Sequence, residues 1–512
     1  MKMKTQTYMS NIENSTNLIS KNNSILKSRL TIFFVEAICM ILELCSSYLL
    51  YPYFGNSNAI WISIITVILL SNCLGNILGG YLCNKSNKNY TGTIFFLTSA
   101  FITFILGFNE VVVSIIQKLP FENNINTLIC SLVLFLPAEL LLGTIPPQVM
   151  YKETTEDNYN AEKTGLVYAL STMGGLFGTV FGGFILVPYI GCKYIIIICA
   201  IMVLIFAFVY EHKFYKKTTC VISLITIIGI IFSSIAYKEE NWLNKDFSSY
   251  KVDSQYNRII IRNRIENGEK IRDMIMASGY ESATYLDEDK RNELIFEYLK
   301  DLNITFYENE LINSDKSLMI GGAAYQFPKY LLSHYHNKSI DVIELDKTVT
   351  ELAKKYFFLQ DCIDEFDPEL KRLGLYNDDG REFLKKSNNK YNLIINDAFS
   401  GKSPIATLSS VEFMKIVKSR LESDGIYIMN IISTKSGNSK RFLLSEAKTL
   451  STIFKNVYII DCRPDLEDEK ERNLILIGTD NTYDFKDTVN LDFSQGIVLT
   501  DDYCPVDYLT NS

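Results

Sequence analysis

Residues 317–346 read SLMIGGAAYQFPKYLLSHYHNKSIDVIELD, and this stretch decides the fold of the C-terminal half of the chain. Its first four residues, 317–320, are typical of a buried strand, and a glycine pair follows them as a turn. Residues 325–334 have a helical pattern, residues 340–345 form a second apolar strand, and residues 347–356 a second helix. A strand, a glycine turn, a helix and a strand that ends in an acid open a doubly wound nucleotide-binding sheet.

Two features of this unit predict a ligand site. Gly321 and Gly322 have no Cβ, so the backbone at the turn can approach a ligand closely. Glu344 follows about twenty residues later, at the end of the second strand, where an acid can accept both ribose hydroxyls. A glycine pair alone also fits an ordinary tight turn. Combined with Glu344 and the later strands, it predicts nucleotide binding.

Two further strands are predicted at residues 391–397, YNLIIND, and 425–432, GIYIMNII. Asp379 and Gly380 precede a short predicted helix, and Asp397 ends the first of these strands. Acids at the carboxyl ends of successive strands converge on the crevice where open α/β sheets bind ligands. The alternatives are a helix N-cap for Asp379 and a turn acid for Asp397. We favour a functional role for Asp397, and only slightly for Asp379.

A small β subdomain is predicted before this core. Between Tyr250 and Met276, short alternating runs flank the turn formed by residues 266–268, which indicates a hairpin subdomain over residues 245–285. A helix is expected from about Asp289 to Leu302, within a Rossmann-type core that covers residues 286–512.

The first half of the chain is predicted to be an α-helical transmembrane bundle. Apolar runs long enough to cross a bilayer recur up to residue 237 and none occurs later, so we assign residues 29–240 to the membrane and 245–512 to a soluble domain. Residues 1–28 are rich in Asn, Ser and Lys and are expected to be a disordered polar tail. Seven spans are the most economical count, at about 31–52, 59–82, 91–109, 127–149, 164–189, 194–211 and 218–237.

Three carboxylates fall within these predicted spans: Glu36, Glu43 and Glu139. An ionisable residue in a span is by default a functional hypothesis, here a proton or polyamine path. The alternative is that Glu36 lies near the interface and the others form hydrogen bonds within the bundle. The sequence gives the two interpretations equal weight.

The basic residues give conflicting information about membrane orientation. Lys and Arg cluster in the N-terminal tail and around alternate loops, which the positive-inside rule places in the cytoplasm. With seven spans, the soluble domain would then face outward, in conflict with an intracellular nucleotide substrate. We give the chemistry more weight and expect a multi-pass protein of the cell membrane with a cytoplasmic catalytic domain.

The composition excludes several classes of function. Up to Asn244 the chain has 15 Lys+Arg and 13 Asp+Glu, which leaves 35 and 45 for the soluble half, a net charge of −10. This acidic balance argues against a nucleic-acid partner and is compatible with a cationic substrate. The 11 cysteines have no CxxC spacing and are expected to be reduced thiols. With only three histidines, a zinc site or a histidine-dependent triad is not expected.

Taken together, the motifs resemble those of the membrane-fused spermidine synthases, or polyamine aminopropyltransferases. In the membrane half the similar segments are LEL (42–44), YPYFG (51–55), Trp61 and LGNILGGYL (74–82). In the soluble half they are IGGAAYQFPKYLL, DVIELD, DDGREFL, NDAFSGKSPIATL and TDDYCPVDYL, in the family's order and spacing.

This resemblance implies an S-adenosylmethionine-dependent-transferase-like fold that binds decarboxylated S-adenosylmethionine as a co-substrate, with no tightly bound cofactor and no metal. The methionine-derived arm is expected along Gly321 and Gly322 and the ribose on Glu344. The adenine amino group is expected near Asp379. Gly380 and Asn257 complete the implied nucleotide-binding residues.

The resemblance also implies that Asp397 is the catalytic acid of an aminopropyl transfer to putrescine or a related amine. A diamine is mostly protonated near neutral pH and cannot attack until one nitrogen loses its proton. An aspartate can hold the cation and accept that proton. Tyr325, Asp501 and Asp502 are the candidate amine-binding residues.

The chain departs from the soluble enzymes of the family mainly at the amine site. Ala323 and Ala324 replace a segment that carries an acid in those enzymes, and residues 399–401 lack their second acid. Asn257 stands where they usually have Gln, and residues 278–279 stand where an Asp-Gly pair is expected. The nucleotide site therefore matches the family better than the amine site.

Two other functions stay open at this point. A methyltransferase uses the same sheet and ribose acid for S-adenosylmethionine itself, although no Arg or Lys at the glycine turn is placed to hold its carboxylate. A membrane polyamine transporter or sensor with a non-catalytic nucleotide-binding domain would instead use Glu36, Glu43 and Glu139. The expected partners are small amines and nucleosides and the lipid bilayer, and a homo-oligomer is compatible with the sequence.

Overall fold

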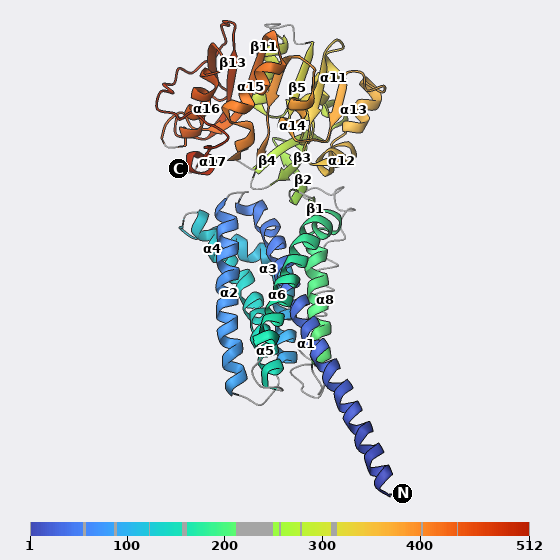
Figure 1. Ribbon diagram of the computed structural model, residues 1–512. Helices are drawn as coiled ribbons and strands as arrows, with labels where there is room; N and C mark the ends of the chain where they lie inside the picture. Colours follow the sequence, from blue (N-terminus) through green and yellow to red (C-terminus); the bar gives the residue numbers. More distant parts are fainter. Residues whose placement is uncertain are drawn as a thin grey trace. The chain divides into compact units, whose positions relative to one another are not determined.

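The structure is a computed structural model that describes residues 2–54, 58–85, 90–121, 123–155, 161–210, 249–254, 256, 258–276, 279–308, 315–400, 403–437 and 439–510. The chain divides near residue 239 into two compact units. The first is helical and the second combines helices with β-sheets, as Figure 1 shows.

The helical unit contains six helices, or helix pairs, that are long and apolar enough to cross a membrane within the described residues. Each is almost free of charge over a stretch of bilayer length, because a charged side chain in hydrocarbon is costly. The candidate spans are Ile25–Leu50, Ile60–Lys85, Thr91–Ile116, Asn124–Tyr151, Ala161–Leu186 and Cys192–Tyr210. Their helices are α1 (Lys2–Phe54), α2 (Asn58–Lys85), α3 (Thr91–Ile116), α4 (Asn123–Gly143), α5 (Ile145–Thr155), α6 (Ala161–Phe181), a π-turn (Gly182–Leu186), α7 (Val187–Ile190) and α8 (Cys192–Tyr210).

Two predictions for this unit have different outcomes. The seventh predicted span, 218–237, lies outside the described residues. At residues 1–28, where a disordered polar tail is expected, the structure has a helix, because α1 begins at Lys2 and continues without a break to Phe54. An apolar span nucleates the helix, after which each added residue gains a hydrogen bond at little cost, so the polar residues extend it.

Glycines allow two pairs of helices in this unit to pack closely. A Cβ at Gly174 or Gly178 of α6 would collide with the backbone of Phe33 or Ala37 of α1. A Cβ at Gly79 of α2 would likewise meet the backbone of the segment that joins α4 to α5. These contacts are the close backbone approach that small residues permit in membrane bundles.

The three predicted membrane carboxylates come from two helices and lie close enough to interact electrostatically. Glu139 of α4 is buried and accepts a hydrogen bond from the thiol of Cys39 on α1. Glu36 of α1 forms a hydrogen bond with Ser171 of α6. The hydrogen bond of Glu139 fits the structural alternative, whereas that alternative expected Glu36 near the interface and not hydrogen-bonded to Ser171. Neither bond tests the functional interpretation.

The soluble unit begins with a four-stranded antiparallel sheet in the order β1-β2-β3-β4. Its strands are β1 (Ser249–Asp253), β2 (Arg258–Glu266), β3 (Glu269–Met276) and β4 (Gly279–Tyr285). The turn between β2 and β3 is Asn267-Gly268, and both residues have positive φ angles, of 51° and 84°. Asparagine and glycine tolerate that conformation, which matches the twist of a hairpin.

The larger sheet has seven strands in the order β12-β13-β11-β8-β5-β6-β7. The strands β5, β6, β7, β8 and β11 are parallel, and β13 runs antiparallel between β11 and β12. Their bounds are β5 (Lys316–Ile320), β6 (Ser339–Ile343), β7 (Leu373–Tyr376), β8 (Tyr391–Asn396), β11 (Leu421–Ser433), β12 (Asn456–Asp461) and β13 (Arg472–Thr479). The predicted Rossmann-type core is confirmed.

Helices cover both faces of this sheet (Figure 1). On one face lie α10 (Glu297–Asn303), α11 (Gln326–His334), α12 (Lys347–Tyr356) and α13 (Leu359–Phe366). On the other lie α14 (Gly380–Lys386), α15 (Val411–Arg420) and α16 (Arg441–Ser451). Other short elements of the described residues include the strands β9 (Phe399–Ser400) and β10 (Ser403–Pro404) and the helix α17 (Val506–Thr510).

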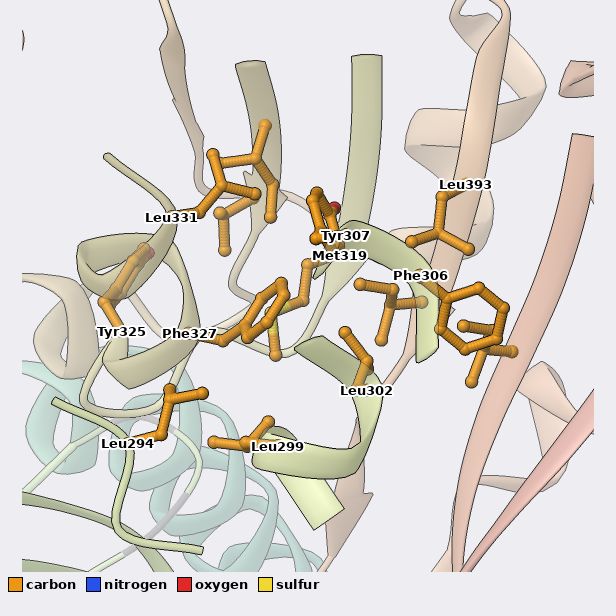
Figure 2. Close-up of a cluster of buried hydrophobic side chains, with 14 of the residues drawn as sticks. Leu294, Leu299, Leu302, Phe306, Tyr307, Met319, Tyr325, Phe327, Leu331 and Leu393 are labelled. Carbon is orange, nitrogen blue, oxygen red and sulfur yellow. The ribbon is translucent and has the colours of Figure 1, made fainter. Parts of the chain in front are cut away.

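The strands are apolar on both sides because a parallel sheet is buried on both faces. Figure 2 shows part of the first core, where Phe327 of α11 lies among Met319 of β5 and Leu299 and Leu302 of α10. The helix expected at 289–302 is shorter than predicted, and α10 begins only at Glu297. Packing of Leu299 and Leu302 against β5 sets the position of this short helix.

A buried lysine ties the small sheet to the core. The Lys329 ammonium of α11 donates hydrogen bonds to the Thr284 hydroxyl of β4 at 3.0 Å and to the carbonyl oxygens of Arg291 and Phe357 at 2.7 and 2.8 Å. Burial lowers the pKa of Lys329 to about 7. The small sheet and the core therefore share a fixed contact beside the glycine turn.

Candidate functional site

The candidate site lies where the parallel strands of the large sheet end. The strand order reverses beside β5, since β6 and β7 follow on one side and β8 and β11 on the other. Such a reversal point is where open α/β sheets bind ligands. Across this edge, from β13 to β6, the residues are Asn473, Ile432, Asp397, Gly321 and Glu344 in that order.

The glycine turn leaves β5 against the end of β8. Gly321 has a φ of +94°, and a Cβ there would lie 2.5 Å from the carbonyl oxygen of Asp397. The amide of Asp397 donates to the carbonyl of Ile320 at 2.9 Å. Only glycine fits both this conformation and this contact, so the turn and Asp397 are held as one rigid edge.

Glu344 is buried directly after β6, and its carboxylate organises the glycine turn. One oxygen accepts hydrogen bonds from the amides of Gly322 at 2.9 Å and Ala323 at 3.1 Å, and the other accepts from the amide of Asp346 at 3.0 Å. Burial raises the pKa of Glu344. A carboxylate has about four lone-pair positions, so one remains for a ligand hydroxyl.

Asp397 follows β8 and is half-buried within a network of neutral donors. The Tyr298 hydroxyl of α10 donates to one carboxylate oxygen at 2.9 Å, and the Asn430 amide of β11 donates to the other at 2.8 Å. The Asn473 amide of β13 donates in turn to the Asn430 side-chain oxygen at 3.0 Å. Burial raises the pKa of Asp397 to about 6, against the opposing effect of these donors, so this carboxylate can exchange a proton near neutral pH.

A cavity of about 510 Å³ joins these residues. Gly321, Gly322, Glu344 and Asp397 all line it, as the sequence predicts. Among its described lining residues the only charged groups are Glu344, Asp346 and Asp397, and there is no Lys or Arg. The site is therefore negative and suits a cationic ligand.

Asp379 and Gly380 do not line the cavity. Asp379 is the N-cap of α14 and accepts a 2.9 Å hydrogen bond from the amide of Glu382, as the capping alternative predicts. Tyr256 does line the cavity, and its pKa is raised mainly by burial and by the charge of Asp346. The charge of Asp379 makes a smaller contribution in the same direction. Asp379 thus lies near the β7 end of the cavity. Asn257 is outside the described residues.

The structure does not place the three candidate amine-binding residues at the cavity. Tyr325 is fully buried beneath Gly322, and its hydroxyl shares a 2.9 Å hydrogen bond with Thr350. Asp501 pairs with both terminal nitrogens of Arg381, which lowers its pKa to about 2, and Asp502 is an exposed turn residue. None of the three is among the described residues that line the cavity, and their assignment to amine binding stays a prediction.

Sequence reasoning missed three residues that hold Asp397. Asn430 and Asn473 are polar residues inside otherwise apolar strands, and such an interruption is the signal that could have identified them. Both lie on one face of the sheet, since Asn473 pairs with Ile432 and residues two apart on a strand share a face. Tyr298 carried no comparable signal, because the start of α10 depends on packing.

Part of the soluble unit matches a known protein family. Residues 297–463, which carry Tyr298, the glycine turn, Glu344, Asp397 and Asn430, match the family model of the spermine/spermidine synthase domain. Within the soluble unit, residues 297–463 are therefore similar to a spermine/spermidine synthase domain. The matched segment forms the five parallel strands and most of the described residues that line the cavity.

Curated relatives carry the corresponding names. A polyamine aminopropyltransferase of Clostridioides difficile is 30% identical over 198 residues, which cover 37% of this chain and 64% of that protein. A probable polyamine aminopropyl transferase of Bifidobacterium longum is 24% identical and covers 47% of this chain and 49% of that protein. Polyamine aminopropyltransferase 2 of Aquifex aeolicus is 23% identical over 427 residues, which cover 78% of each chain. The match with the relative from Bifidobacterium longum thus spans about half of that protein's length.

Solved structures similar to the chain include a probable spermidine synthase from Corynebacterium glutamicum, with 20% identity and a TM-score of 0.40 over 48% of this chain and 85% of that one. A spermidine synthase in complex with the transition-state analogue AdoDATO has 18% identity and a TM-score of 0.36, over 47% and 76% of the two chains.

Proposed function

We propose that the protein transfers an aminopropyl group from decarboxylated S-adenosylmethionine to putrescine or a related amine. The acceptor nitrogen attacks the carbon next to the sulfonium, a C–N bond forms and the C–S bond breaks. The products are a spermidine-type polyamine, methylthioadenosine and one proton. The donor is a co-substrate that leaves in each turnover, and the proposal requires no tightly bound cofactor.

The observation that carries this proposal is the position of Asp397. It lies at the reversal point of the sheet, against the glycine turn, and its pKa is raised to about 6. An ionised carboxylate there can orient a protonated amine and then accept its proton as the nitrogen attacks. The family match supports the same reaction.

We assign the donor's parts along the same edge. Glu344 would accept a ribose hydroxyl with its remaining lone pair, and the adenine would extend past β6 toward Asp379. The sulfonium arm would pass Gly321 and Gly322, where the missing Cβ atoms leave the backbone open. The reacting carbon would then lie beside Asp397.

A methyltransferase is the less favoured reading. Intact S-adenosylmethionine carries a carboxylate that needs a donor such as Arg or Lys. The described lining of this cavity has three acids and no such donor. The acidic site therefore suits the decarboxylated, doubly cationic form better.

We also propose that the helical unit anchors the enzyme in the cell membrane with its soluble domain in the cytoplasm. Six long apolar helices support the membrane assignment. The soluble domain is placed in the cytoplasm because the proposed donor, decarboxylated S-adenosylmethionine, is an intracellular metabolite.

The experiment uses the full-length protein in detergent with decarboxylated S-adenosylmethionine and a panel of amines. The proposal predicts release of methylthioadenosine and an equimolar alkylated amine. Methyl transfer from S-adenosylmethionine, with no aminopropyl product, would contradict it. Nucleotide binding without turnover of any amine would instead support the transporter or sensor alternative.

A further inference from the structure

The acceptor part of the cavity has a definite location because the site residues form a row. Glu344 follows β6 and Asp397 follows β8, so these acids are two strand spacings apart, or about 10 Å at 4.8 Å per strand. If the nucleoside occupies the β6 side, the acceptor must enter from the other side of Asp397. That side is formed by β11 and β13.

The β11 and β13 side of the cavity, which we call the acceptor arm, is formed by Asn430, Ile432 and Asn473. The two asparagines are linked to each other and to Asp397 by hydrogen bonds. No carboxylate follows these two strands among the described lining residues, since Glu344 and Asp346 both follow β6. As far as the described lining residues go, the acceptor arm is therefore uncharged beyond Asp397.

This charge distribution determines which amine fits. The reacting nitrogen is held by Asp397, and the remainder of the acceptor must lie against an isoleucine and neutral amides. A second ammonium placed there would lose its hydration without gaining an anionic partner, which is costly. An alkyl, hydroxyl or amide group carries no such cost.

We propose that the preferred acceptor is a primary amine with a single positive charge and an uncharged remainder, and that Ile432 and Asn473 set this preference. The inference rests on the proposed aminopropyl transfer and identifies its acceptor class. Among the proposed acceptors, putrescine or a related amine, it favours a singly charged relative over the α,ω-diamine putrescine.

The test compares acceptors of equal length with the full-length protein and decarboxylated S-adenosylmethionine. Methylthioadenosine release is measured with 1,4-diaminobutane, 4-amino-1-butanol and butylamine. We expect kcat/KM for one of the singly charged amines to exceed that of the diamine by about tenfold or more, equivalent to about 1.4 kcal/mol. Equal or better use of the diamine would overturn the inference. No release with any amine would refute the transfer reaction itself, and the inference with it.

A charge-restoring variant tests the location of the acceptor arm. Asn473→Asp places a carboxylate there, so the ratio of diamine to monoamine kcat/KM should rise by about tenfold or more. Asn267→Asp, in the exposed hairpin turn, is the matched control and should leave the ratio unchanged. If the first variant does not fold, Ile432→Asp repeats the test from the neighbouring strand β11, where Ile432 pairs with Asn473. An unchanged ratio in a folded variant would place the acceptor elsewhere.

Discussion

The side-chain amide of Asn430 donates a 2.8 Å hydrogen bond to one carboxylate oxygen of Asp397. The Tyr298 hydroxyl donates to the other oxygen at 2.9 Å. Both donors are neutral, and they stabilise the ionised form without cancelling its charge. Burial outweighs them, so the pKa of Asp397 is raised rather than lowered. The result is a carboxylate suited to exchanging a proton near neutral pH.

The first prediction concerns the pH dependence of turnover. Asp397 has a pKa of about 6 and accepts a proton only when ionised, so kcat/KM should fall about tenfold per pH unit below 6. Above pH 7 the same group is already ionised, so its contribution should be constant. Initial rates between pH 5 and 8 check this. A profile that is flat from pH 5 to 7 would show that Asp397 does not act as the base.

The second prediction concerns Tyr298→Phe. This change removes one donor to the carboxylate and keeps the ring, so the ionised form of Asp397 loses stabilisation and its pKa should rise further. The midpoint of the pH profile should move upward by up to about one unit, the scale of one hydrogen bond to a charged group. A loss of rate with an unmoved midpoint would assign Tyr298 to packing alone.

The third prediction concerns Glu344→Gln. An amide cannot accept all three backbone hydrogen bonds and a ribose hydroxyl, so nucleotide binding should weaken by about 1–3 kcal/mol. Calorimetry with methylthioadenosine measures this. Glu351→Gln, an exposed site on α12, is the matched control. If both variants bind methylthioadenosine with equal affinity, Glu344 does not contribute to nucleotide binding.

The fourth prediction is that the soluble half folds without the membrane helices. Its three buried apolar clusters consist entirely of residues from Tyr250 onward, so it contains its own core. A fragment that starts near Lys245 should be soluble and give a cooperative thermal transition. A fragment that is recovered only in aggregated or molten form would count against an independent domain.

The sequence predicts the sheet and three central site residues for a simple physical reason. Gly321, Glu344 and Asp397 each stand at the end of an apolar strand, and parallel strands bring such ends to one edge. Asp501, a predicted amine-binding residue that does not line the cavity, lacks that context. Its partner Arg381 lies 120 residues away along the chain, so only the folded structure reveals their ion pair.

The acceptor side was harder to predict because it depends on contacts distant in sequence. Asn430 and Asn473 are 43 residues apart and meet because β13 inserts antiparallel beside β11. Tyr298, in the first turn of α10, contacts Asp397 across 99 residues of sequence. Local periodicity specifies neither arrangement.

The measurement that tests the central claim most directly compares Asp397→Asn with the wild type in the full-length protein. An amide there cannot accept the proton of the attacking amine, so methylthioadenosine release from decarboxylated S-adenosylmethionine should slow by about 10²-fold or more. The affinity for methylthioadenosine should remain close to wild type, because Asp397 lies two strands from Glu344. A variant that keeps the full transfer rate, or loses nucleotide binding to the same extent, would contradict the assignment of Asp397 as the base of an aminopropyl transfer.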